Sequence, residues 1–397
     1  MNTGYLLRGA RVIDPASGLD EIRDLRIRGA RLADPDKGDS AGLPERVIDL
    51  SGCIVTPGLI DAHAHVFHTG STIAIEPDKL LAQGTTSVVD AGTAGCANYE
   101  LFETSVMERS AIRILAFLNV YDRGQEDAAL PENFDPALYD REAMAQLAAK
   151  HPGILGLKLR LSRGLVPDDR AAEILRACVE LADELEAQIG RRLRLCVHAT
   201  DCPLPAVELA AMLRPGDIFC HCFQGKGHPI LTEKGAIVPG VLEARERGVL
   251  FDAANGRGNF SLSVAREALR AGFLPDLISS DLTVSTFRGS PHVRSLPHVM
   301  SKYLSLGLSL PEVLRRCTEN PARVLGLEGE IGTLRPGARA DIAVFKLEDR
   351  IWEQEDFCGE KIRCEQLLAP QMTFLNGEPV FSRSQDHPHS GWLAQAL

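Results

Sequence analysis

Short apolar runs alternate with amphipathic stretches through the middle of the chain. Apolar residues recur at helical spacing over 142–150 and 170–183, whereas the runs between such stretches are short enough for buried strands. This alternation is typical of a parallel α/β architecture, and eight strand–helix repeats over about 270 residues predict a (β/α)8 TIM barrel. The predicted strands are 58–65, 85–91, 112–119, 154–160, 194–199, 217–222, 249–253 and 277–281.

Both ends of the chain carry a different pattern, in which short strand-like segments are separated by Gly, Pro and Asp turns. We therefore predict a small β-sandwich domain formed from both chain termini. The strand-like segments are 5–14, 22–28, 47–50, 340–345, 367–369 and 372–381. The predicted domains are 1–54 for the N-terminal part of the β-domain, 55–330 for the barrel, 331–385 for the C-terminal part of the β-domain and 386–397 for a tail.

Two histidines one residue apart, His63 and His65, follow an apolar run over 54–60 that we interpret as one buried strand entered through a Pro-Gly turn. Residues i and i+2 of a strand point to the same face, so both imidazoles can reach one metal ion. Such pairs also occur on solvated strands. The buried context favours a metal site, because buried imidazoles need partners.

Ionisable residues stand at five of the eight predicted strand ends, and active sites of TIM barrels gather at these ends. Each residue also has an ordinary structural explanation, such as a core histidine, a lysine that faces solvent or a helix cap. Their joint occurrence at one end of one barrel indicates a metal site. The residues are His63 and His65 on the first strand, Lys158 on the fourth, His198 on the fifth, His221 on the sixth and Asp281 on the eighth.

Two longer stretches resemble the amidohydrolase superfamily of metal-dependent hydrolases. Thr56-Pro-Gly-Leu-Ile-Asp-Ala-His-Ala-His65 is similar to the family's strand-one motif, and residues 320–344 are similar to its segment leading from the barrel back into the β-domain. In the binuclear branch, the resemblance implies two divalent metal ions, for which we expect Zn²⁺. It assigns His63, His65 and Asp281 to one ion, His198 and His221 to the other, and a bridging position to Lys158 carboxylated by CO₂.

The resemblance also implies a reaction. Hydroxide that bridges the two metals would attack the carbonyl of an amide or ester, and Asp281 would act as the catalytic acid and base. For substrate binding we predict Arg160, which lies on the face of Lys158 but could equally form a structural ion pair. We add Asn255, Arg257 and Asn259, because they lie in a glycine-rich loop after the seventh strand.

Phe67 narrows the substrate class. Dihydroorotases usually have an arginine two residues after the second histidine, where this chain has Phe67. The sequence is more similar to the deacetylase, or dihydroorotase-like, branch. We predict hydrolysis of a small acylated carboxylate, either an N-acetyl amino acid or an O-acetyl 2-hydroxy acid. A cyclic amidohydrolase that opens dihydroorotate-like or hydantoin-like rings and a dipeptidase remain alternatives. A non-catalytic barrel scaffold is disfavoured, because all six ligand positions are present.

Charge and composition limit the partners. A net charge of −11 and an isoelectric point near 5.5 argue against nucleic acid and anionic membranes, which attract basic surfaces. Small molecules are therefore the expected partners, and a homo-oligomer is compatible with the sequence. Ten scattered cysteines indicate a reducing compartment. We see no signal peptide and no apolar run long enough to cross a bilayer, so we expect a cytoplasmic protein.

Overall fold

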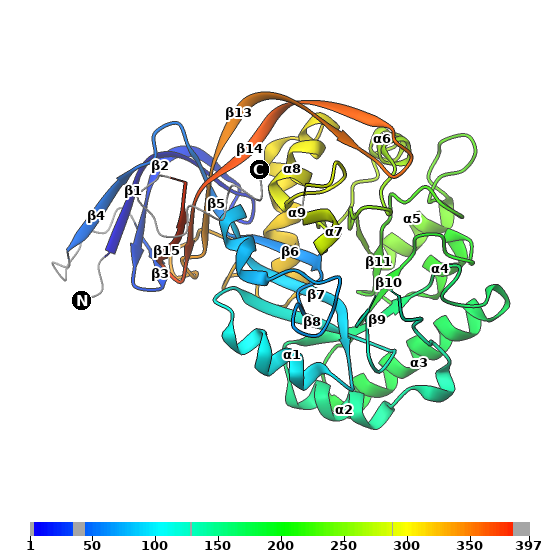
Figure 1. Ribbon diagram of the computed structural model, residues 1–397. Helices are drawn as coiled ribbons and strands as arrows, with labels where there is room; N and C mark the ends of the chain where they lie inside the picture. Colours follow the sequence, from blue (N-terminus) through cyan, green and yellow to red (C-terminus); the bar gives the residue numbers. More distant parts are fainter. Residues whose placement is uncertain (1–3, 35–43, 128, 288, 384–397) are drawn as a thin grey trace.

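The computed structural model describes residues 4–34, 44–127, 129–287 and 289–383, and the predicted tail, 386–397, lies outside them. Within these residues the strands form a seven-stranded parallel sheet and an eight-stranded sheet. Figure 1 shows the parallel sheet curled and covered by helices, with the second sheet beside it. The α/β fold is therefore confirmed at this level.

The parallel sheet has the order β12-β11-β10-β9-β8-β7-β6, so strands adjacent in sequence are adjacent in space. Seven of the predicted strands are present with small shifts at their ends. They are β6 (Leu59–Ala64), β7 (Thr85–Gly95), β8 (Arg113–Asn119), β9 (Ile154–Arg160), β10 (Arg194–His198), β11 (Ile218–Cys220) and β12 (Leu250–Asp252).

Helices follow these strands on the outside of the sheet, as Figure 1 shows for α1 to α5. The two predicted helices are present as α2 and α3, of which α3 continues to residue 189. The α-helices are α1 (Tyr99–Ser105), α2 (Arg141–Lys150), α3 (Ala171–Ile189), α4 (Ala206–Met212), α5 (Pro239–Glu246), α6 (Leu262–Arg270), α7 (Val284–Phe287), α8 (Leu296–Ser305), α9 (Leu310–Cys317) and α10 (Glu319–Val324). The short 3₁₀ helices are η1 (Pro77–Gln83), η2 (Met107–Arg109), η3 (Pro136–Leu138) and η4 (Asp168–Arg170).

The segment predicted as the eighth strand, 277–281, is not a regular strand. Single bridges join Leu277 to Asp252 and Leu282 to Ala64, so the segment touches both edge strands of the curled sheet. Backbone hydrogen bonds continue on both sides of the segment, because the N–H of Asn255 donates to the Ser279 carbonyl and that of Asp281 donates to the His63 carbonyl. The segment therefore joins both edges of the curled sheet through single bridges, and not through the continuous strand that the sequence predicts.

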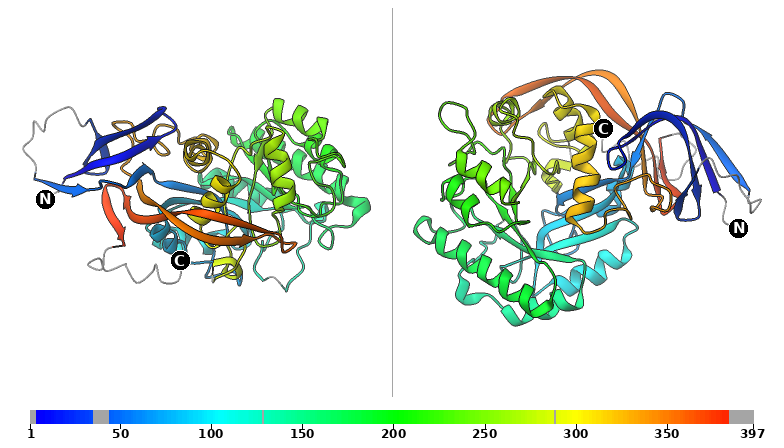
Figure 2. Two further views of the ribbon diagram at one scale, coloured as in Figure 1. Left: turned by 90° about the horizontal axis from the view of Figure 1, so that it is seen from above. Right: turned by 180° about the vertical axis from the view of Figure 1, so that it is seen from behind.

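The second sheet combines strands from both ends of the chain. Its order is β15-β14-β13-β5-β1-β2-β3, with β4 also paired to β1. The predicted segment 367–369 and the first part of 372–381 lie on one long strand, and the rest of 372–381 lies on β15. β13 and β14 form a long hairpin that reaches over α8 (Figure 2). The strands are β1 (Gly4–Asp14), β2 (Leu19–Arg28), β3 (Arg31–Ala33), β4 (Glu45–Asp49), β5 (Ile54–Pro57), β13 (Ile342–Glu355), β14 (Lys361–Leu375) and β15 (Glu378–Ser382).

The apolar run over 54–60 is divided between the two sheets, and not one strand as the sequence suggests. β5 pairs with β1 and β13, whereas β6 pairs with β7. Gly58 lies between them and packs tightly, because a Cβ atom there would lie 2.2 Å from Thr86 Oγ1. The strand that carries the histidine pair therefore starts at the junction of the sheets.

Two separate groups of buried apolar residues accompany the two sheets. The larger group packs around the parallel sheet and its helices, and the smaller one draws on residues 5–55 and 334–374. No helix of the described part of the chain has the length and apolar character needed to span a membrane.

Candidate active site

The histidine pair lies at the C-terminal end of β6 and faces Asp281. Asp281 Oδ1 is 3.3 Å from His65 Nε2 and 3.6 Å from His63 Nε2, and all three residues are buried. The three side chains can present one ligand atom each within 4.8 Å of one another. Burial, together with Lys158, holds the pKa of His63 well below its usual value. His63 is therefore a neutral imidazole, the form that ligates metal ions.

The backbone of Asp281 has a positive φ of 52°, which is a strained conformation for a residue other than glycine. Strained backbone of this kind is frequent at functional sites. Its N–H donates to the His63 carbonyl at 2.7 Å, and Asn259 Nδ2 donates to its Oδ2 at 2.8 Å. Burial acts to raise the pKa of Asp281, but the hydrogen bond from His65 and the nearby His63 outweigh it and lower that pKa. Asp281 is therefore an ionised carboxylate aimed at the histidines.

His198 and His221 form a second imidazole pair, with ring centroids 4.2 Å apart. His221 also has a positive φ, 60°, and its Nδ1 lies 2.7 Å from the Ala254 carbonyl. That carbonyl can only accept, so Nδ1 carries the proton and Nε2 presents a lone pair. Nε2 is buried without a partner, and burial lowers the pKa of His221 to about 3. A buried, unpartnered imidazole nitrogen fits a metal ligand.

Lys158, on β9, is buried between the two groups of ligands. Its Nζ is 3.4 Å from His63 Nε2, and its aliphatic stem packs on Gly92, where a Cβ atom would lie 2.5 Å from Lys158 Cβ. Burial acts to lower the pKa of Lys158, but the neighbouring Cys196 and Cys220 outweigh it and raise that pKa. Capture of CO₂ needs the neutral amine, so carboxylation requires a cation beside Lys158 to lower this pKa.

Three residues that the sequence analysis missed orient the ligands. Asp252 Oδ2 lies 3.3 Å from His63 Nδ1, and Thr93 Oγ1 lies 2.8 Å from His65 Nδ1. Asp90 accepts from the backbone N–H of Thr93 and so fixes that loop. Asp252 ends β12, so the search for ionisable residues at strand ends could have found it.

A cavity opens above these ligands. Its lining residues are His63, His65, Ile73, Gln125, Lys158, Arg160, His198, Arg257, Gly258, Asn259, Asp281, Thr283 and Ser285. Every predicted site residue lines it except His221, which lies beneath, and Asn255.

The four predicted substrate contacts differ in their surroundings. Arg160 pairs with the buried Glu132, so its charge is already matched. Arg257 is exposed and has no ion pair or hydrogen bond with any described residue. Asn255 is buried, donates to the Ser279 carbonyl and accepts from Lys302, so it supports the loop instead of lining the cavity. The free cation of the cavity wall is therefore Arg257.

Phe67 does not point into the cavity. Its side chain is fully buried and packs on Phe102, with ring centroids 4.9 Å apart. The position that usually carries a substrate-binding arginine in dihydroorotases thus belongs to the hydrophobic core in this protein.

The curled parallel sheet, with imidazoles, a carboxylate and a lysine at the ends of its strands, defines the class of metal-dependent hydrolases. Comparisons with known proteins agree. The amidohydrolase family model matches residues 255–381. A deacetylase of Agrobacterium fabrum is 32% identical over 338 residues, which cover 84% of this chain and 80% of the relative.

Two crystal structures cover nearly the whole chain. One, of a dihydroorotase, is 30% identical with a TM-score of 0.82 and covers 96% of this chain and 98% of its own. The other, of an adenine deaminase, is 26% identical with a TM-score of 0.84 and covers 95% of this chain and 99% of its own. The chain belongs to the amidohydrolase family and is a metal-dependent hydrolase that acts on C–N bonds.

Proposed function

We propose that this enzyme removes the acyl group from a small acylated carboxylate, such as an N-acetyl amino acid or an O-acetyl 2-hydroxy acid. The observation that carries the proposal is Arg257, an unpaired guanidinium on the wall of the cavity that holds His63, His65 and Asp281. A guanidinium binds a carboxylate through two parallel hydrogen bonds. The substrate's acid group would therefore lie at Arg257 and its acyl carbonyl over the histidines.

The residues fit two divalent ions. His63, His65 and Asp281 would hold one, His198 and His221 the other, and carboxylated Lys158 would bridge them. Nitrogen and oxygen ligands of this kind suit Zn²⁺. Bound divalent ions supply a water of lowered pKa and polarise the carbonyl under attack. The two bridges at 277–282 also support closure of the curled sheet into a (β/α)8 barrel, which would bring Asp281 beside the first strand.

The protein's own side chains then account for binding and proton transfer. Arg257 would hold the carboxylate, and Asn259 keeps Asp281 in one orientation through the bond to Oδ2. Asp281 Oδ1, which faces the histidines, would take the proton of the attacking water and give it to the departing nitrogen or oxygen. We expect the active chain to need neither nucleic acid nor a membrane, although it could assemble as a homo-oligomer.

Ring opening is the second candidate, because dihydroorotases are among the relatives of this chain, and one of them is 45% identical over 435 residues. The observation that favours deacylation is the burial of Phe67 in the core, at the position where dihydroorotases usually have an arginine. A cyclic substrate would therefore depend on Arg257 alone as the cation for its carboxylate.

A hydrolysis screen separates the candidates. Purified enzyme is offered N-acetyl-D- and N-acetyl-L-amino acids, O-acetyl 2-hydroxy acids, dihydroorotate and hydantoins, and product formation is followed by mass spectrometry. We expect turnover of one acylated class and at most trace ring opening. Turnover of the cyclic compounds alone would overturn the proposal.

The metal content is a separate prediction. Metal analysis of the purified enzyme should give about two divalent ions per chain, mainly zinc, and Lys158 should carry an additional carboxylate. Treatment with a chelator should remove both, because a raised pKa keeps the amine protonated without adjacent cations. Infrared difference spectra after ¹³CO₂ labelling would follow the carbamate. One ion per chain and no labelled carbamate would contradict the binuclear assignment.

A further inference from the structure

Two cysteines that the proposed reaction does not use lie directly beneath the metal ligands. Cys196 is on β10, two residues before His198, and Cys220 ends β11 immediately before His221. Residues i and i+2 share a strand face, so Cys196 and His198 point the same way. Neighbouring residues normally alternate, but the positive φ of His221 turns its side chain to the face of Cys220.

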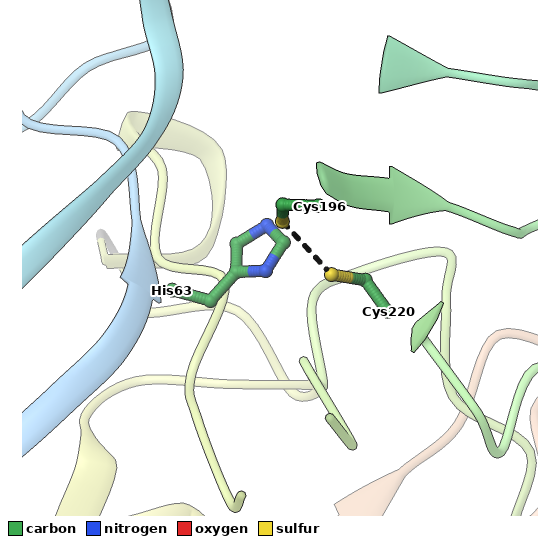
Figure 3. A group of neighbouring side chains, drawn as sticks. All are labelled: His63, Cys196 and Cys220. Carbon is green, nitrogen blue, oxygen red and sulfur yellow. Dashed lines mark hydrogen bonds between the residues drawn. The ribbon is translucent and has the colours of Figure 1, made fainter. Parts of the chain in front are cut away.

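The two thiols and His63 point toward one another (Figure 3). The sulfur atoms are 3.2 Å apart, and the three side chains can present ligand atoms within 4.8 Å of one another. All three residues are almost completely buried. This group shares only His63 with the group that contains His65 and Asp281.

Two sulfurs and an imidazole differ in chemical type from the two imidazoles and one carboxylate of His63, His65 and Asp281. Thiolates prefer soft cations such as Cd²⁺, Cu⁺ and Zn²⁺, whereas carboxylates prefer harder ones. Zn–S bonds of about 2.3 Å at a tetrahedral centre place two sulfurs about 3.8 Å apart. Cys196 and Cys220 therefore need to separate by only about 0.6 Å, which is within side-chain adjustment.

A neighbouring carboxylate favours a cation at this group, the Lys158 ammonium opposes one until it is carboxylated, and the open cavity leaves a route to the sulfurs. Asp252, a buried carboxylate, lies 3.3 Å from His63 Nδ1. The thiols themselves are enclosed, but His63 and Lys158 line the open cavity, and Lys158 Nζ is 3.6 Å from Cys196 Sγ. An ion that enters the cavity reaches the sulfurs by passing these two side chains.

We propose that Cys196, Cys220 and His63 form a binding site for one thiophilic d¹⁰ cation beneath the hydrolytic centre, and that this ion takes His63 from the hydrolytic metal because a neutral imidazole offers a single lone pair. Each thiol loses its proton to solvent when the ion binds, and the two thiolates and the imidazole supply three of its ligands. The site does not depend on which acyl substrate the enzyme uses. It makes the protein sensitive to soft metal ions in a way that the carboxylate-containing group does not.

Cadmium titration of the enzyme as purified tests the site, because sulfur–cadmium bonds absorb in the ultraviolet. We expect the band to saturate at one Cd²⁺ per chain in the wild type and in Cys178→Ser, which alters a buried cysteine outside the group. Cys196→Ser and Cys220→Ser should each lose more than half of the band while keeping a wild-type circular dichroism spectrum. An unchanged band in both variants would overturn the proposal.

X-ray absorption at the cadmium edge gives a second test that needs no variant. With one equivalent of Cd²⁺ on the wild-type enzyme, the proposal requires two sulfur neighbours together with nitrogen or oxygen. A single sulfur would indicate an exposed thiol such as Cys358, and no sulfur would indicate the carboxylate-containing group. Either result would reject the site.

Discussion

At the residue scale, Asp281 combines three structural features. It faces two histidines, it accepts a hydrogen bond from Asn259, and its backbone has a strained conformation. A strained residue persists when its surroundings overdetermine it. Here the carbonyl of His63 and the amide of Asn259 fix both ends of the residue. Its carboxylate is therefore held in one position, which the proposed roles as metal ligand and proton acceptor require.

Asp281→Asn should reduce kcat by about 10²- to 10⁴-fold, the usual contribution of a general acid and base. The amide oxygen can still bind a metal ion but cannot take a proton, so we expect most of the metal to remain. Steady-state kinetics and metal analysis measure the two effects. Asp349→Asn, on the distant β13, is the control and should match the wild type. Unchanged turnover in Asp281→Asn would remove this residue from proton transfer.

Arg257→Ala tests carboxylate binding separately from the fold. We expect KM for acylated acids to rise about tenfold or more and KM for neutral ester analogues to change little, because a charge-assisted hydrogen bond is lost only with the acid. Arg160→Ala is the contrasting variant. It leaves the buried Glu132 without its cation and should lower the thermal midpoint, whereas Arg257→Ala should not. Equal KM changes for acids and esters would argue against the assigned role of Arg257.

At the scale of elements, the loop between β12 and α6 is built around close packing on Asp281. Gly256 has φ at +56°, and a Cβ atom there would lie 2.2 Å from Asp281 Oδ2 and 2.7 Å from Asn259 Nδ2. Glycine is therefore required by both backbone and space. Gly258, two residues later, would meet only the end of Lys226, at 3.7 Å.

These two glycines make a matched pair. Gly256→Ala should lower kcat at least tenfold, because the new methyl group displaces the carboxylate of Asp281 or its Asn259 partner. Gly258→Ala should keep kcat within about twofold of the wild type, since 3.7 Å is ordinary van der Waals contact. Both are measured with the best substrate of the screen. Equal losses in the two variants would show that general loop rigidity, and not contact with Asp281, controls activity.

At the scale of the whole molecule, Lys302 links the loop that carries Arg257 to the helices and to the β13–β14 hairpin. It lies on α8, donates to Asn255 Oδ1 at 2.5 Å and sits 3.4 Å from the centre of the Phe260 ring. The preceding residue of α8, Ser301, contacts β14, because its Oγ accepts a hydrogen bond from the Leu368 N–H. Burial lowers the pKa of Lys302 to about 7.

This lowered pKa predicts a pH-dependent stability. Above pH 7 folded Lys302 is neutral, whereas the unfolded lysine stays protonated until about pH 10. The unfolded state therefore binds more protons, and the free energy of unfolding should gain up to about 1.4 kcal/mol per pH unit from this residue. The gain should be clearest between pH 7 and 8.5, below the usual pKa of thiols.

Lys302→Met isolates that contribution, because methionine keeps the apolar stem and removes the titration. Unfolding followed by circular dichroism at several pH values should show the wild type gaining stability relative to the variant as pH rises from 7 to 8.5. A constant difference across this range would mean that Lys302 stays charged in the folded protein.

The sequence by itself determined what the spacing of residues dictates. Apolar periodicity located seven strands and the helices α2 and α3, because burial of one face imposes a period on the chain. Strand ends marked His63, His65, Lys158, His198 and His221, since parallel strands deliver their carboxyl ends to one edge of a sheet. These positions needed no knowledge of distant contacts.

Only the tertiary structure decided which partners each side chain meets. Arg160 and Arg257 look alike in sequence, yet Glu132 pairs with Arg160, whereas Arg257 has no ion pair with any described residue. The split at Gly58, the irregular segment at 277–281 and the meeting of Cys196 with Cys220 likewise depend on contacts between segments distant in sequence. Local periodicity records which face a residue presents, but the packing of distant segments determines what lies opposite it.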